Sequence, residues 1–218
     1  MRIHLSLSKP QKSIPFDHQP SLVGAIHKWL GDNEIHGRTS LHSFSNLVGG
    51  KKSGEGLIFP YSPKWFISAH NNEVIKTIIR GIQIDPIINF GLEVKEVVIQ
   101  DNPVLGNMEK FSVASPVFIK RRIGESVKHF TFEDADSDIH LTETLITKLN
   151  KAGLNSENIE VCFDRSYSRP LTKLINYNGI KNRASICPVI VRGSPEQVLF
   201  AWNVGVGNST GIGFGALN

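Results

Sequence analysis

Close to its carboxyl end the chain reads Gly205-Val206-Gly207-Asn208-Ser209-Thr210-Gly211-Ile212-Gly213-Phe214-Gly215, with five glycines in eleven positions. Glycines let a backbone approach phosphates closely and adopt positive φ, so that consecutive N–H groups can form an anion cradle. Asn208, Ser209 and Thr210 add amide and hydroxyl donors. Phe214 places an apolar anchor in the run, which favours a folded loop over a flexible tail. This glycine-rich loop (residues 205–215) therefore predicts a site for an anion.

The glycine-rich loop lacks the companions of two common nucleotide-binding motifs. No Gly-Lys-Ser/Thr follows it, as a P-loop requires, and the sequence closes at Asn218 without the helix of a dinucleotide fingerprint. ATP and NAD are therefore not expected, and we predict no cofactor.

The composition is that of a globular protein with a basic balance. Hydrophobic residues make up 40% of the chain and charged residues 20%. Lys and Arg number 24 against 20 acidic residues, and a pI near 9.1 favours an anionic partner. Cys162 and Cys187 have no Cys-x-x-Cys spacing and are interpreted as reduced core thiols. No run is long enough to span a bilayer, so we expect a cytoplasmic protein without a membrane partner.

Hydrophobic patterning divides the chain into two similar halves. The first half predicts a strand at 1–7, a helix at 21–30 that begins with Ser21 and a loop-rich segment at 31–56. Two strands at 57–59 and 65–67, a helix at 71–82 and a strand at 92–99 follow. The second half predicts one clear helix at 138–152 and strands at 115–119, 159–163, 185–191 and 197–204. A turn at Gly193-Ser194-Pro195 joins the last two strands. The last helix of this half is assigned to the short stretch 171–176.

Both halves approximate the order β-α-β-β-α-β. The sequence therefore predicts an α+β fold of two tandem ferredoxin-like (RRM-like) domains, at residues 1–114 and 115–218.

Three histidines lie in or after the first predicted helix, and histidine as a residue type is suited to proton transfer because its unperturbed pKa lies close to neutral. His36 follows the helix in a polar turn. His27 lies within the helix, where it is equally well explained as a packing residue. His42 begins a short apolar stretch and is either a rival or a partner of His36.

The glycine-rich loop, His36-Gly37 and Leu41-His42-Ser43-Phe44-Ser45-Asn46-Leu47 together resemble the Cas6 family of CRISPR-associated endoribonucleases. The resemblance implies cleavage of CRISPR repeat RNA (pre-crRNA) by attack of a ribose 2′-hydroxyl on the neighbouring phosphate. The products would be a 2′,3′-cyclic phosphate and a 5′-hydroxyl, and no metal would be needed.

The same resemblance implies roles for particular residues. His36 matches the usual catalytic histidine of the family, and His27 stands where many relatives carry a tyrosine. Lys52 matches the family's lysine, although the adjacent Lys51 leaves the register open. We therefore predict His36, His42, His27 and Lys52 as catalytic residues.

Basic residues supplement the glycine-rich loop as candidates for RNA contact. Lys120-Arg121-Arg122 ends a predicted strand and could follow an RNA backbone, although a solvated strand end fits as well. The predicted RNA contacts are Gly205, Gly207, Asn208, Ser209, Thr210, Gly211, Gly213, Phe214, Gly215, Lys120, Arg121 and Arg122.

Acidic residues at 134–138 begin like a calcium loop. Ile139 replaces the required glycine, however, and Leu145 replaces the closing glutamate. We interpret the segment as negative charge at a helix start and predict no metal site.

Two other classes of function remain open. A non-catalytic RNA-binding subunit of a CRISPR effector complex would keep the fold and the loop but have no cleavage to lose. A ferredoxin-like domain binding a small anion would show no preference for repeat RNA. The sequence also leaves open a homodimer and contacts with other effector subunits.

Overall fold

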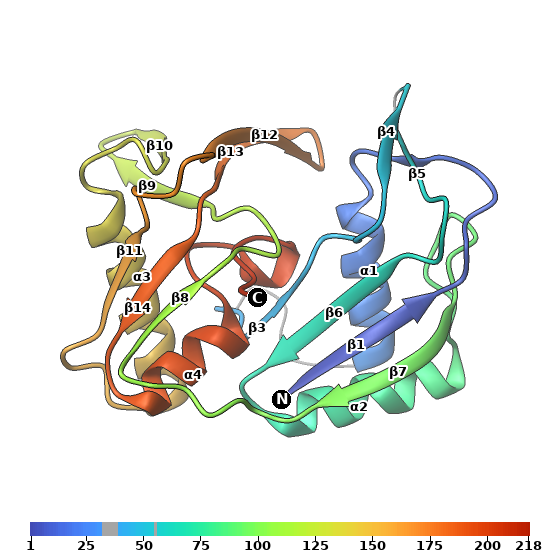
Figure 1. Cartoon of the computed structure of the whole chain (residues 1–218), viewed down its shortest axis with the longest axis horizontal. Helices are drawn as coiled ribbons and strands as arrows, with labels where there is room; N and C mark the ends of the chain where they lie inside the picture. The colour runs from blue at the N-terminus through green and yellow to red at the C-terminus, as the bar shows by residue number, and fades with distance from the viewer. Residues whose placement is uncertain (32–38, 55) are drawn as a thin grey trace.

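The computed structural model describes residues 1–31, 39–54 and 56–218, which form two α+β domains (Figure 1). The main sheet of the first domain and its two helices consist of β1 (Arg2–Leu7), α1 (Gln19–Leu30), β3 (His42–Phe44), β6 (Lys64–Ala69), α2 (Asn72–Ile84) and β7 (Val94–Gln100). The strands form an antiparallel sheet of order β3-β6-β1-β7, and both helices share its core. This is the ferredoxin-like arrangement that the sequence predicts.

Local sequence explains both helices of the first domain. Asn71 caps α2 by accepting a hydrogen bond from the amide of Glu73 at 2.9 Å, and apolar residues recur at helical spacing along its buried face. The start of α1 differs from the prediction, because the helix begins at Gln19 and contains Ser21. Proline in the first turn presets the helical φ and moves the start upstream.

A smaller sheet extends the first domain beyond its helices. It consists of β2 (Ile14–Pro15), β5 (Gly56–Ile58) and β4 (Lys51–Ser53), in that order. Figure 1 shows this sheet at the same edge of the molecule as a hairpin of the second domain, formed by β12 (Leu171–Tyr177) and β13 (Ile180–Ile186).

The second domain repeats the ferredoxin-like order. Its main elements are β8 (Met108–Phe111), α3 (Ser137–Ala152), β11 (Glu160–Phe163), β14 (Val189–Arg192) and α4 (Pro195–Val204). The sheet order is β11-β14-β8, and the end of the chain pairs beside β8 through a bridge between Val113 and Leu217. The last residues therefore take the place of a fourth strand.

The second domain starts earlier than the sequence predicts. β8 pairs with β14 and precedes the predicted first strand at 115–119. Lys120-Arg121-Arg122 lies inside β9 (Ile119–Ile123), which forms a hairpin with β10 (Ser126–Phe130), and does not end a strand. Because β8 pairs with β14, we group it with the second domain, whereas the prediction placed all residues up to 114 in the first.

The predicted strand at 197–204 is wrong, because these residues belong to α4. Ser194 accepts from the amide of Gln197 at 3.3 Å, and the Gln197 side chain accepts from the Ser194 amide at 2.8 Å, which together make a capping box. The helix is buried on nearly every side, so it lacks the polar face by which helices are recognised. The stretch 171–176, predicted as the last helix, is strand β12.

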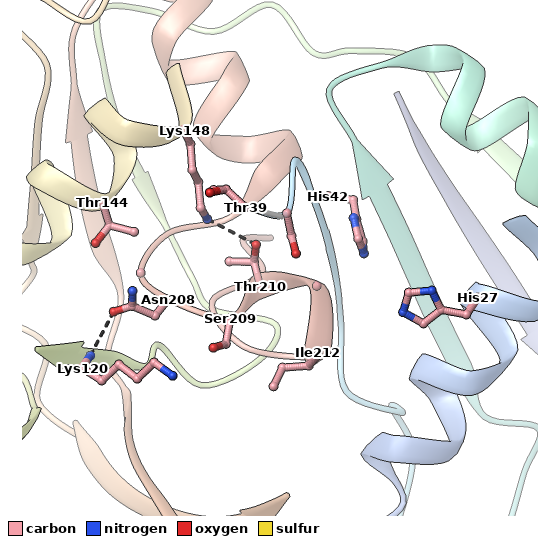
Figure 2. A pocket seen from close by; sticks show the side chains of 13 residues that line it. His27, Thr39, His42, Lys120, Thr144, Lys148, Asn208, Ser209, Thr210 and Ile212 are labelled. Atoms are coloured by element: carbon pink, nitrogen blue, oxygen red, sulfur yellow. Dashed lines mark hydrogen bonds between the residues drawn. The ribbon is translucent and has the colours of Figure 1, made fainter. Parts of the chain in front are cut away.

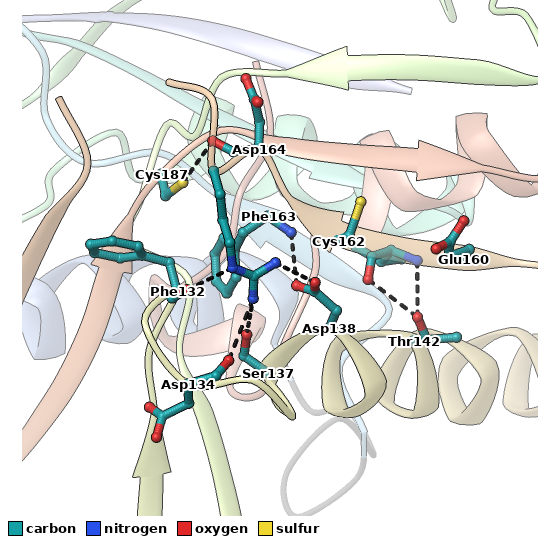
Figure 3. Close-up of polar contacts among 12 residues, drawn as sticks. Phe132, Asp134, Ser137, Asp138, Thr142, Glu160, Cys162, Phe163, Asp164 and Cys187 are labelled. Carbon is teal, nitrogen blue, oxygen red and sulfur yellow. Dashed lines mark hydrogen bonds and ion pairs between the residues drawn. The ribbon is translucent and has the colours of Figure 1, made fainter. Parts of the chain in front are cut away.

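Polar contacts at the start of α3 explain the acidic segment (Figure 3). Asp138 accepts from the amide of Phe163 at 2.9 Å and pairs with the guanidinium of Arg165. Arg165 also donates to the Phe132 carbonyl and the Ser137 hydroxyl, each at 3.0 Å. The acidic residues thus lie at a helix start, as predicted. Cys162 and Cys187 are both free thiols.

Among the described residues, no helix has the length and apolar character needed to cross a membrane.

Candidate functional site

A cavity of about 550 Å³ opens between the two domains (Figure 2). One wall comes from the first domain and the other from α3, β9 and the glycine-rich loop. The lining residues are His27, Thr39, Ser40, His42, Lys120, Thr144, Lys148, Gly207, Asn208, Ser209, Thr210, Gly211 and Ile212. Residues predicted from opposite ends of the chain are therefore brought together.

Close packing explains two glycines of the loop. A Cβ on Gly207 would lie 2.5 Å from the Phe118 carbonyl oxygen, and its φ of 74° already disfavours a side chain. A Cβ on Gly211 would lie 2.2 Å from Oγ of Ser40 and 3.1 Å from Cε1 of His42. These glycines allow the loop to press against protein from both domains.

Only the middle of the loop faces the cavity. The residues from Gly207 to Ile212 line it, whereas Gly205, Gly213, Phe214 and Gly215 are buried outside its lining. Phe214 is 0% exposed, and its ring lies 5.0 Å from that of Phe118. The structure gives these four residues a packing environment, so we do not carry them forward as RNA contacts.

The backbone of the loop offers donors at its centre. Within the described part of the chain, the amides of Ser209, Thr210 and Gly211 make no hydrogen bond. The side chain of Asn208 already has a partner within the protein, because its Oδ1 accepts a hydrogen bond from the amide of Lys120 at 2.9 Å. That bond joins the loop to β9.

One residue of the basic triplet reaches the cavity. Lys120 lines it, and Arg121 and Arg122 do not. Arg121 instead donates to the His140 carbonyl at 2.7 Å and to Oγ1 of Thr144 at 3.0 Å, which ties β9 to α3. Arg122 is exposed and donates to the Gly124 carbonyl at 3.2 Å.

The histidines of the first domain differ in their surroundings. His42 in β3 is 4% exposed, and burial, aided by the nearby His27 and Lys148, lowers its pKa to about 4, so the ring is neutral at neutral pH. His27 in α1 is partly exposed on the cavity wall. His36 and Gly37 lie outside the described residues. Thr39, three positions after His36 in the sequence, lines the cavity.

Lys52 lies elsewhere. It projects from β4 into a second cavity of about 680 Å³, which is lined also by His18, Asn46 and Lys173 of β12. Its Nζ lies 5.9 Å from the centroid of the Phe16 ring. The structure thus places Lys52 and the two described histidines in different cavities.

Comparison with known proteins identifies the family. The family model for the C-terminal part of CRISPR associated protein Cas6 matches residues 100–218, more than half of the chain. The chain belongs to the Cas6 family. No curated protein sequence matches it.

Solved Cas6 structures confirm the fold. A Cas6-related protein from Pyrococcus furiosus is 22% identical, with a TM-score of 0.85 over 100% of this chain and 97% of that one. A protein described as a RAMP protein binding different RNA substrates is 20% identical, with a TM-score of 0.86 over 100% and 98%. Thermus thermophilus Cas6 is 10% identical, with a TM-score of 0.63 over 99% and 96%. The predicted two-domain α+β fold is therefore confirmed.

Lys148, on the inner face of α3, is a cavity residue that the sequence-based prediction did not include. Its side chain is 2% exposed, and burial lowers its pKa to about 7. The sequence does contain a pattern that indicates a buried lysine. Lys148 follows Leu141 and Leu145 along the apolar stripe of an amphipathic helix and stands next to Leu149. A lysine within such a stripe requires acceptors that only the rest of the fold can provide.

In the part of the chain that the structure describes, no three His, Cys, Asp or Glu side chains are grouped as they would be around a metal ion.

Proposed function

We propose that this chain binds CRISPR repeat RNA and cleaves it as a metal-independent endoribonuclease. The 2′-hydroxyl of one ribose would attack the adjacent phosphate, and the 5′-oxygen of the next nucleotide would leave. Membership of the Cas6 family supports this proposal. The observation that carries it is the cavity between the domains, where His27 faces Lys120 and the glycine-rich loop.

The reaction needs a base for the hydroxyl, an acid for the leaving oxygen and positive charge near the phosphate. Lys120 provides a cation at the cavity, and the amides of Ser209, Thr210 and Gly211, which bond to no described residue, would be the donors for a phosphate there. His42 is a poor proton acceptor near neutrality because its pKa is about 4. We therefore assign proton transfer to His36 and His27, and give His42 the role of supporting the loop beside Gly211.

A non-catalytic RNA-binding subunit is the second candidate. Two observations favour it: His42 is buried and neutral, and Lys52 lies in the other cavity. In that case the cavity between the domains would hold RNA without cutting it.

The deciding experiment is incubation of the purified protein with its host's repeat RNA in excess EDTA, followed by mapping of the product ends. The wild type, His36→Ala and His27→Ala would be compared with His4→Ala, a matched control in β1 outside the cavity. Cutting at one site to a 2′,3′-cyclic phosphate, lost in His36→Ala while binding persists, would support the enzyme. Tight binding without cutting by the wild type would support the binding subunit.

A further inference from the structure

Lys148 borders the cavity on its α3 side and packs against the glycine-rich loop (Figure 2). Its Nζ donates to Oγ1 of Thr210 at 3.2 Å and to the carbonyls of Gly205 at 3.0 Å and Val204 at 3.4 Å. All three acceptors are uncharged. Burying an ammonium group against neutral acceptors costs free energy, and such groups are often associated with function.

Thr210 connects this ammonium group to the cavity. A hydroxyl has one proton to donate and two lone pairs that accept. Because Oγ1 of Thr210 accepts from Lys148, its own proton is directed away from that lysine. Thr210 lines the cavity, so a phosphate oxygen there is a suitable acceptor.

We propose that Lys148 is a positioning residue for RNA phosphate, which acts through Thr210 by orienting its hydroxyl and by placing a positive charge against the loop. The inference rests on the proposed function, since it takes RNA as the ligand of this cavity. The charge lies in a region shielded from water, where its attraction to a phosphate is screened less than that of a surface lysine.

Because the pKa of Lys148 is low, its contribution to RNA binding should depend on pH. With a pKa of about 7, the amine of the free protein loses its proton as the pH rises through neutrality. A bound phosphate favours the charged form, so RNA affinity should fall above neutral pH. His27, His42, Lys120 and Arg121 face or flank the same region, and a Lys148 variant retains all four.

The test is fluorescence anisotropy with repeat RNA, using a deoxyribose at the mapped cleavage position if the wild type cuts. Lys148→Met should weaken binding roughly tenfold below neutral pH, and the difference from wild type should shrink well above it. Lys151→Met, an exposed lysine on the same helix, should change affinity less than about twofold. Equal losses in both variants, or a pH-independent loss in Lys148→Met, would overturn the inference.

Variants of Thr210 test the same inference without altering the lysine. Thr210→Val should weaken binding as Lys148→Met does, Thr210→Ser should retain it, and the double variant with Lys148→Met should be no weaker than the worse single one. Additive losses, or equal binding by the Val and Ser variants, would reject the link. If thermal unfolding shows no cooperative transition for Lys148→Met, the comparison of Thr210→Val with Thr210→Ser decides. A wild type that binds no repeat RNA would instead reject the proposed function.

Discussion

Arg2 donates a hydrogen bond from its Nη2 to the carbonyl of Leu217 at 2.7 Å, which joins the second residue of the chain to the last but one. The same nitrogen donates to the Trp202 carbonyl at 3.1 Å. Its guanidinium carbon lies 3.9 Å from the Phe66 ring centroid and 3.7 Å from that of Trp202. Arg2 is 1% exposed, so this is a buried contact between the two domains.

Arg2→Met should lower the free energy of unfolding by about 2–4 kcal/mol, because the variant leaves the Trp202 and Leu217 carbonyls buried without this donor. Urea denaturation would measure the change. Arg80→Met, an exposed arginine in α2, is the matched control and should change stability by less than about 0.5 kcal/mol. Equal stability of the two variants would contradict this account of the domain junction.

His42 should make the protein less stable in mild acid. Its folded pKa of about 4 is below its usual 6.5, so between these values the unfolded chain binds a proton that the folded protein does not. The contribution, on the order of 3 kcal/mol, is complete above the unfolded pKa and is lost as the pH falls toward the folded one.

Urea midpoints of the wild type and His42→Gln across this pH range would measure that contribution. His18 and His70, whose pKa values are also lowered by burial, are present in both proteins and cancel in the difference. Parallel pH curves for the two proteins would refute the prediction.

Lys52→Ala should weaken RNA binding severalfold and reduce its salt dependence by about one counterion, because Lys52 and Lys173 line one cavity and, under the proposed function, each would contact an RNA phosphate. Cleavage at saturating RNA should stay unchanged. Single-turnover kinetics with an affinity titration would separate the two effects. Lys51→Ala is the neighbouring control outside that cavity. A slower cleavage step at saturation would return Lys52 to a catalytic role.

Ser194→Ala should destabilise the protein by about 1 kcal/mol, because Ser194 caps α4 through the amide of Gln197. Ser194→Asp, another good N-cap residue, should restore most of the loss. Thermal unfolding of the three proteins would show the order. An alanine variant as stable as the wild type would mean that tertiary packing alone holds this helix end.

Local sequence determined much of the fold. The helices α2 and α3 were predictable because each shows an apolar stripe at helical spacing beside a polar face. The glycine-rich loop and the first-domain histidines predicted the family, which the family model confirms. These signals depend on neighbouring residues, so they can be read along the chain.

Tertiary structure decided what the same residues do. Helix α4 appeared as a strand because burial on nearly all sides removes the periodicity that identifies a helix. Phe214 lies in the core, and Lys52 and His42 line different cavities. Lys148 meets Thr210 across 62 positions of sequence. Such contacts depend on how the two domains pack around the loop, because burial and long-range hydrogen bonding are properties of the assembled chain and not of any local pattern.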